Sequence, residues 1–181
     1  MNNTTQKPAP IFLHALNTIP GIGPATLHKL KERFGSFERA WAASRHDLES
    51  MGIARSVTDA FLQRRAAINP EQLFDLLRRE GIWVITEDNT LYPNLLREIH
   101  QPPVIIYGRG RREALQISKS YAVAVVGTRT PTSYGKHATE HLVSELARSG
   151  IVIISGLALG IDSFAHRAAL EAGGVTIAVL G

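Results

Sequence analysis

The chain has 181 residues, of which 44% are hydrophobic and 20% are charged, and this balance excludes a largely disordered protein. It contains no cysteine, which excludes disulfide scaffolds, cysteine nucleophiles and cysteine-based zinc sites. The formal net charge of +4 lies entirely within residues 1–70, where nine Lys and Arg residues face five Asp and Glu residues, and such a concentration favours phosphate-rich partners.

The first ten residues are polar and lack the apolar stretch of a signal peptide. No apolar run in the sequence is long enough to span a bilayer. We therefore expect a cytoplasmic protein without a membrane partner.

Residues 1–70 are predicted to form a small all-α domain. Leu27, Leu30 and Phe34 follow one another at helical spacing, and Gly35 is a typical helix end. Ser36 then provides a cap for the next helix. No strand pattern occurs in this region.

The turn Ile19-Pro20-Gly21-Ile22-Gly23 separates two of these helices and resembles the hairpin of helix-hairpin-helix DNA-binding modules. With no side chains in the way, the amides of Gly21 and Gly23 can face a phosphate, and Lys29 follows within reach. On this reading, Gly21→Val removes the contact and leaves the helices folded. Two alternatives stay open: a helical corner that binds nothing, and an assembly surface that binds protein.

Residues 71–181 are predicted to form an α/β domain. Five short apolar runs indicate strands buried on both faces of a parallel sheet: Ile82–Thr86, Val104–Tyr107, Tyr121–Val126, Ile151–Ile154 and Val175–Leu180. Helical stretches separate the last three runs, which gives two βαβ units. The chain stops straight after the last run, where a covering helix is expected, so we expect a fragment of a longer protein, truncated on the C-terminal side of its sheet.

Two loops of this sheet carry candidate binding residues. Gly127, Thr128 and Arg129 follow one strand, and Ser155 and Gly156 follow the next. Ligands of parallel sheets bind beyond the carboxyl ends of the strands. There Gly127 allows close approach of an anion, Thr128 offers a hydroxyl and Arg129 offers two parallel hydrogen bonds. The alternative is a tight turn with a surface arginine.

Other kinds of site receive less support from the sequence. Asp162 and His166 stand four residues apart and can pair on a helix near Ser155, but a hydrolytic triad lacks the usual G-x-S-x-G turn. His137 and His141 lack a third ligand, so no metal site is predicted. The motifs G-x-x-x-x-G-K-[ST] and G-x-G-x-x-G are absent, so we expect no nucleotide or dinucleotide cofactor.

Three strings together resemble the bacterial DNA-processing protein family, DprA or Smf. They are Val-Gly-Thr-Arg with Tyr-Gly over 126–135, Ser-Gly-Leu-Ala-Leu-Gly-Ile-Asp with Ala-His over 155–166, and the segment 173–181. Tyr92-Pro93, Pro103-Val104 and Tyr107-Gly108 match the segment that precedes them in that family. The resemblance covers nearly the whole chain.

The resemblance implies a fold and a function. It implies a Rossmann-like domain, preceded by a helix-hairpin-helix or SAM-like domain, that is not an enzyme and has no catalytic residues. Such proteins bind and protect single-stranded DNA, help to load the RecA recombinase in natural transformation, and form homodimers. The DNA-binding residues it implies are Gly127, Thr128, Arg129, Ser155, Gly156 and Arg167.

Two competing functions stay under consideration. The first is a nucleotide phosphoribohydrolase of the lysine-decarboxylase-like class, which also binds phosphate beyond parallel strands. That class needs a Pro-Gly-Gly-x-Gly-Thr loop and a catalytic acid, and neither is present. The second is an assembly module whose N-terminal helices bind protein instead of DNA.

Overall fold

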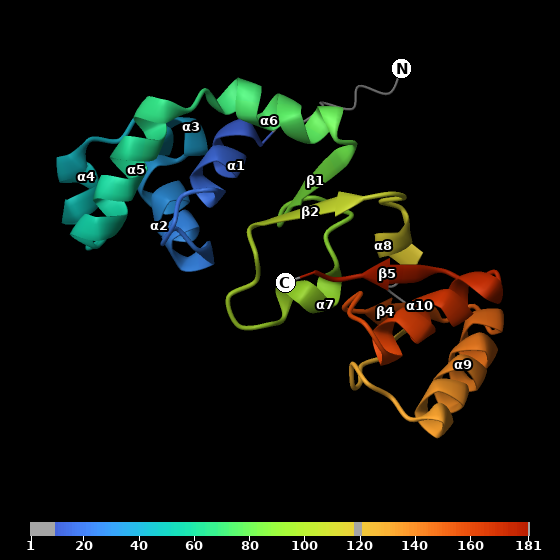
Figure 1. Cartoon of the computed structure of the whole chain (residues 1–181). Helices are drawn as coiled ribbons and strands as arrows, with labels where there is room; N and C mark the ends of the chain where they lie inside the picture. Colours follow the sequence, from blue (N-terminus) through green and yellow to red (C-terminus); the bar gives the residue numbers. More distant parts are fainter. Residues whose placement is uncertain (1–9, 118–120, 181) are drawn as a thin grey trace, which may run out of the picture. The chain divides into compact units, whose positions relative to one another are not determined.

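The computed structural model describes residues 10–117 and 121–180 (Figure 1). Contacts divide the chain into two units, which we call the helical unit, Met1–Gly110, and the sheet unit, Arg111–Gly181. In the two described ranges, no helix is both long and apolar enough to cross a bilayer.

The helical unit begins with six helices packed around a leucine-rich core. They are α1 (Ile11–Asn17), α2 (Pro24–Phe34), α3 (Phe37–Trp41), α4 (Arg45–Ser50), α5 (Arg55–Ala67) and α6 (Pro70–Arg79). Leu16, Leu27 and Leu30 are fully buried, and Trp41 packs against Phe61 with ring centres 5.7 Å apart. The all-helical character expected of this region is confirmed for residues 10–70.

The helix ends form where the sequence predicts them. Gly35 ends α2 in the left-handed conformation, and its amide donates to the carbonyl of Lys31. Ser36 then caps α3, since its hydroxyl accepts a hydrogen bond of 3.2 Å from the amide of Arg39. One turn therefore closes α2 and starts α3.

The first two predicted strands pair with each other. β1 (Ile82–Thr86) and β2 (Ile105–Arg109) form an antiparallel pair, and α7 (Asn94–Arg97) lies in the connection between them. The prediction that these two runs belong to a parallel sheet is wrong. Their apolar side chains contact the helical core, in which Val104 and Ile105 are buried, so packing on helices explains their hydrophobicity.

The division into units falls later in the chain than the boundary expected at residue 70. α6 contacts both α1 and β1, and α1 also contacts β2. The Tyr107 hydroxyl lies 2.8 Å from Nδ1 of the buried His14 on α1. These contacts bind the hairpin to the helices, which places residues 71–110 with the helical unit.

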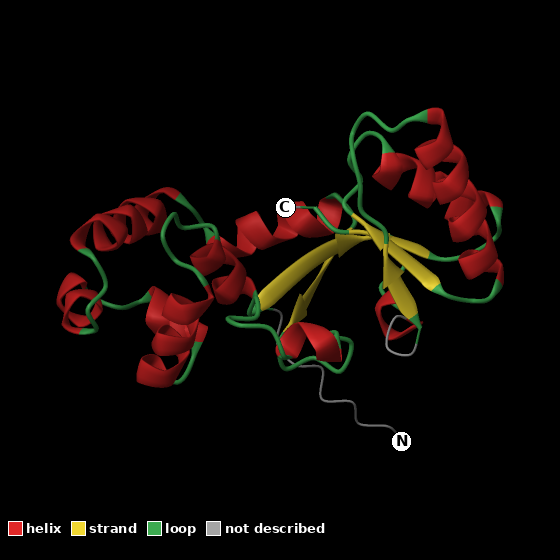
Figure 2. Cartoon of the chain, turned by 90° about the horizontal axis from the view of Figure 1, so that it is seen from below, coloured by secondary structure: helices red, strands yellow, loops and turns green. Residues whose placement is uncertain are grey.

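The sheet unit contains both predicted βαβ units. Its elements are α8 (Ala114–Ile117), β3 (Ala122–Ala124), α9 (Ser133–Arg148), β4 (Val152–Ser155), α10 (Ile161–Glu171) and β5 (Thr176–Ala178). The strands are parallel in the order β3-β4-β5. Helices α9 and α10 pack against each other and against β4 (Figure 2), around a core that includes Val143, Ile153 and Ala165.

Burial in this sheet is uneven. β4 is mostly buried, whereas the three residues of the edge strand β3 are exposed. The prediction of strands buried on both faces therefore fits β4 and is wrong for β3. A run of small and β-branched residues indicates a strand but does not reveal whether that strand lies at an edge.

Candidate functional site

The two predicted binding loops meet at the carboxyl edge of the sheet. The amide of Ile161, the first residue of α10, donates a 3.1 Å hydrogen bond to the carbonyl of Thr128. Gly160 has a φ of +85°, and a Cβ there would stand 2.3 Å from the same oxygen. Only glycine allows this approach. The loop after β3 and the start of α10 thus form one rim, and Gly127 packs within it against Ile161.

Thr128 and Arg129 are exposed on this rim. The Thr128 hydroxyl accepts a 3.2 Å hydrogen bond from the amide of Thr130, which holds the turn. Among the described residues, none pairs with the Arg129 guanidinium through a hydrogen bond or an ion pair. A cation without a protein partner is free to bind an anion.

Arg129 lines an open hollow of about 280 Å³ with residues of both helices. Lys136 comes from α9 and Phe164 from α10. The Lys136 ammonium lies 5.1 Å from the centre of the Phe164 ring, and the Arg167 guanidinium carbon lies 5.7 Å from it. One aromatic ring therefore positions two cations beside the hollow.

Sequence reasoning missed Lys136, although a signal was present. Lys136 lies near the N-terminus of α9, where the helix dipole disfavours a cation. Its nearest acid, Glu140, is 4.0 Å away and offers weak compensation. A lysine in this position next to the Gly127–Arg129 turn is typical of an anion site.

Ser155 and Gly156 lie on the same edge but differ in exposure. Ser155 is 4% exposed, and its hydroxyl donates a 2.7 Å hydrogen bond to the carbonyl of Val125, which ties β4 to the end of β3. Gly156 is exposed, and its amide donates to the buried Asp162 carboxylate at 3.1 Å. The same carboxylate oxygen accepts from the amide of Ala158 at 3.4 Å. Asp162 therefore fixes the loop after β4.

The hydrogen bonds of these residues contradict the hypothesis of a hydrolytic triad. Ser155 donates to a backbone carbonyl, and His166 pairs through Nδ1 with the Thr176 hydroxyl at 2.7 Å. Asp162 accepts two backbone amides. The three residues thus satisfy separate backbone and strand contacts, and the geometry supports no activated serine.

His166 makes the stability of the sheet unit sensitive to pH. The Thr176 hydroxyl donates to the carbonyl of Ile153, so it accepts from His166 Nδ1, and Nε2 is buried without a partner among the described residues. Burial lowers the pKa of His166 below its ordinary 6.5, and the nearby Asp162 carboxylate opposes this only in part. His166 therefore binds a proton less readily in the folded protein than in the unfolded chain.

We expect the contribution of neutral His166 to the free energy of unfolding to be complete above pH 6.5. This contribution should decline as the pH falls through 6.5 toward the lower pKa that His166 has in the folded protein. Denaturant unfolding measures this decline in stability. The measurements are made at half-unit steps between pH 7.5 and pH 4.5, the general range where histidine titrates. His166→Gln should flatten it. The pKa of His14 in the helical unit is lowered in the same way, so part of the slope should remain. An identical profile for the variant would contradict the assignment to His166.

The hairpin of the helical unit has the predicted local form. Gly23 is the N-cap of α2, and Lys29 is exposed on that helix. Gly21 has a φ of +85°, and a Cβ there would lie 2.7 Å from Cγ2 of Val57. The expectation that Gly21→Val leaves the helices folded is therefore wrong, since the valine would collide with α5. Lys29 is the better position for a test.

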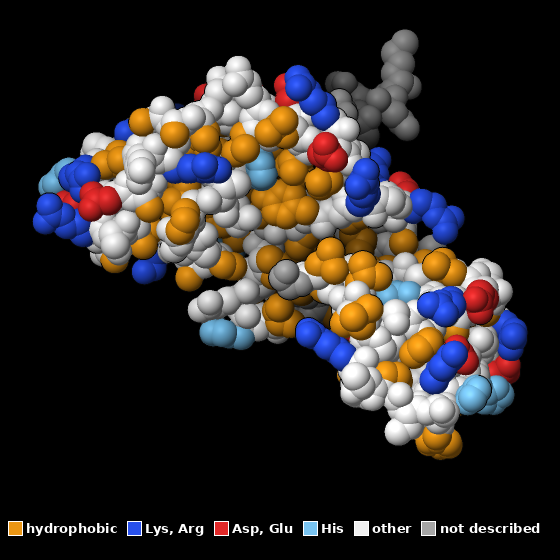
Figure 3. Space-filling model, in the orientation of Figure 1, with side chains coloured by type: hydrophobic (Ala, Val, Ile, Leu, Met, Phe, Trp, Pro, Cys, Tyr) orange, Lys and Arg blue, Asp and Glu red, His pale blue; other side chains and the backbone are white. Residues whose placement is uncertain are grey.

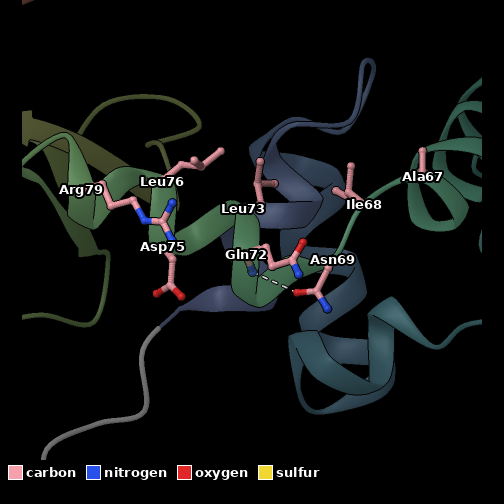
Figure 4. A pocket seen from close by; sticks show the side chains of 8 residues that line it. All are labelled: Ala67, Ile68, Asn69, Gln72, Leu73, Asp75, Leu76 and Arg79. Carbon is pink, nitrogen blue, oxygen red and sulfur yellow. Dashed lines mark hydrogen bonds between the residues drawn. The ribbon is translucent and has the colours of Figure 1, made fainter.

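A second hollow, of about 450 Å³, runs from the end of α5 along α6 in the helical unit (Figure 4). Ile68, Leu73 and Leu76 line it together with Asp75 and Arg79. None of the predicted binding residues belongs to it. Among the described residues, no group of three or more His, Asp or Glu side chains could hold a metal ion.

Charged side chains are spread over the visible face of each unit (Figure 3). Lys and Arg side chains alternate there with hydrophobic and acidic ones. On that face, no continuous basic stripe covers either unit.

Comparisons with known proteins identify relatives of the chain. A family model described as DNA recombination-mediator protein A matches residues 83–181. Protein Smf of Synechocystis sp. is 36% identical over 169 residues, which make up 92% of this chain and 42% of that protein. DNA processing protein DprA of Bacillus subtilis is 42% identical over 103 residues, 57% of this chain and 34% of that protein. The chain spans less than half the length of these curated relatives.

A solved structure resembles the chain over most of its length. The X-ray structure of DNA processing protein A (DprA) from Streptococcus pneumoniae matches with a TM-score of 0.73 and 28% identity, covering 96% of this chain and 58% of that one. The similarity supports the predicted Rossmann-like fold.

Proposed function

The chain belongs to the DNA recombination-mediator protein A family, and on that premise we propose that the rim of its sheet unit binds the phosphates of single-stranded DNA. The observation that carries this proposal is the unpartnered Arg129 guanidinium beside Lys136, in a hollow of the rim. Gly127 and Thr128 supply backbone and hydroxyl groups on the same edge, and the exposed Gly156, whose amide donates to Asp162, allows close approach. Arg167 adds a cation beside the Phe164 ring.

The electrostatics of the rim favour an anion. Lys136 and Arg167 both lie within 6 Å of the centre of one ring, so positive charge is concentrated around Phe164. Phosphates that bind these cations release counterions from the DNA. Contacts of this kind do not distinguish one base sequence from another.

We assign Ser155 a positioning role, in which its hydroxyl ties β3 to β4 and thereby places Gly156. No chemical step is proposed, since the serine, histidine and aspartate of the rim engage separate structural partners. Release of free base from nucleoside monophosphates would instead support the phosphoribohydrolase alternative.

The family and the names of its members support a wider role. We propose that the whole protein protects single-stranded DNA and helps to load a RecA-type recombinase during natural transformation. It would act in the cytoplasm as a homodimer.

The helical unit offers a second phosphate contact. We propose that the turn around Gly21 and Gly23, with the exposed Lys29, touches the DNA backbone. Lys29→Gln tests this contact without the steric conflict that a side chain at Gly21 creates. Unchanged DNA affinity in that variant would favour the assembly-module alternative.

Titration of the chain with a fluorescent single-stranded oligonucleotide at several salt concentrations tests the main proposal. We expect Lys136→Gln to weaken binding by about three- to tenfold, since one phosphate contact is lost. Arg148→Gln is the matched control because Arg148 is exposed at the far end of the same helix. Equal affinities for the wild type and both variants would refute the location of the site.

A further inference from the structure

Three large apolar side chains are exposed on the loops that carry the cationic rim. Val126 is 79% exposed, Leu157 56% and Leu159 78%. We call these three residues the apolar edge. Val126 directly precedes Gly127, and Leu159 directly precedes Gly160, whose backbone packs on Thr128 and Arg129. The apolar edge and the phosphate-binding loops therefore belong to the same turns.

The register of the sheet brings two parts of the apolar edge together. Ala124 of β3 pairs with Ile154 of β4. Val126 and Gly156 each stand two residues beyond this pair, and Leu157 follows directly. Parallel neighbouring strands therefore deliver Val126 and Leu157 to adjacent places at one end of the sheet.

The loop that presents the two leucines is held in an unfavourable conformation. Leu157 has a φ of +58°, which is rare for a residue with a branched side chain. The Asp162 carboxylate accepts the amides on both sides of it, those of Gly156 and Ala158. A buried acid thus fixes a strained loop whose leucines face solvent, and backbone strain of this kind is concentrated at functional sites.

We propose that the apolar edge contacts the unpaired bases of single-stranded DNA and thereby selects single strands over duplexes. The proposal rests on the phosphate site proposed above. An apolar surface directly beside the unpartnered Arg129 guanidinium suits a ligand that is both anionic and apolar. A single strand offers phosphates for Arg129 and uncovered base faces for the leucines, whereas a duplex buries its base faces in its own stack.

The test compares single-stranded and double-stranded oligonucleotides of one sequence, titrated into the intact chain at one salt concentration. The variant is Leu157→Asn with Leu159→Ser, because asparagine tolerates the left-handed conformation at position 157. We expect roughly tenfold weaker binding of the single strand, from the loss of buried apolar area, and unchanged binding of the duplex. Leu170→Ser is the control, since Leu170 is 64% exposed near the opposite end of α10.

The outcomes separate this inference from the proposed function. Unchanged single-strand affinity in the double variant, or an equal loss for both DNA forms, would overturn the selective role of the leucines. Arg129→Ala would still weaken binding in that case if the phosphate site is real. A change of molecular mass without DNA would identify a subunit contact and also overturn the inference. If the double variant does not fold, the same comparison of single-strand and duplex affinity is made with Leu159→Ser alone.

Discussion

Arg129→Ala is expected to weaken the binding of single-stranded DNA by about ten- to a hundredfold, since a charge-assisted hydrogen bond to phosphate is lost. The guanidinium is exposed, lines the hollow with Lys136, and has no partner among the described residues. It cannot lose its proton and can hold a phosphate through two parallel hydrogen bonds. No other rim side chain combines these properties.

The dependence on salt and sequence distinguishes a phosphate contact from other causes. The slope of log affinity against log salt should become shallower by about 0.7 for one lost contact on a single strand. The loss should be similar for two unrelated oligonucleotides. The melting temperature should barely change, since Arg129 stabilises no other described residue. A folded variant with unaltered affinity and slope would contradict the phosphate site, and Arg148→Ala provides the matched loss of charge.

The meeting of the two candidate loops could be predicted because it follows from topology. The carboxyl ends of parallel strands meet at one edge, so a strand followed by Gly127–Arg129 and a neighbour followed by Gly156 had to share a rim. The hydrogen bond from Ile161 to Thr128 confirms that the two loops meet. Periodicity also predicted α2, α3 and the two βαβ units correctly, whereas it gave no sign of the short helices α4, α7 and α8.

Pairing direction and partner choice could not be predicted in the same way. The apolar runs that form β1 and β2 resemble those of β3 and β4 in composition, yet β1 and β2 form an antiparallel pair that packs against the helical core. The contacts of Phe164 could not be predicted either. Its approach to both Lys136 and Arg167 depends on how α9 packs against α10, which local patterns do not encode.

The role of Asp162 is the clearest case in which spacing suggested the wrong partner. Its distance from His166 in sequence predicted a pair on one helical face. The carboxylate instead accepts the amides of Gly156 and Ala158 in the preceding loop. A carboxylate near the start of a helix is also favoured by the helix dipole. Asp162 therefore links the start of α10 to the loop that bears Leu157.

Asp162→Ala is expected to lower the stability of the sheet unit by about 2–4 kcal/mol, since two amides lose a charged acceptor that is 7% exposed. Asp162→Asn keeps one oxygen acceptor, and a neutral acceptor makes a weaker hydrogen bond, so its loss should be about half as large. Both tryptophans, Trp41 and Trp83, belong to the helical unit, so their fluorescence does not report on this change.

Hydrogen exchange of the β4 amides measures the effect within the sheet unit itself. Their protection should fall in the order wild type, Asp162→Asn, Asp162→Ala. Glu171→Ala removes an exposed acid from the other end of α10 and should leave protection unchanged. If the carboxylate also holds Leu157 toward the DNA, Asp162→Ala weakens single-strand binding more than duplex binding, as the leucine variants do. Unchanged β4 protection in Asp162→Ala would show that the loop keeps its shape without the carboxylate, and the argument for a fixed apolar edge would then fail.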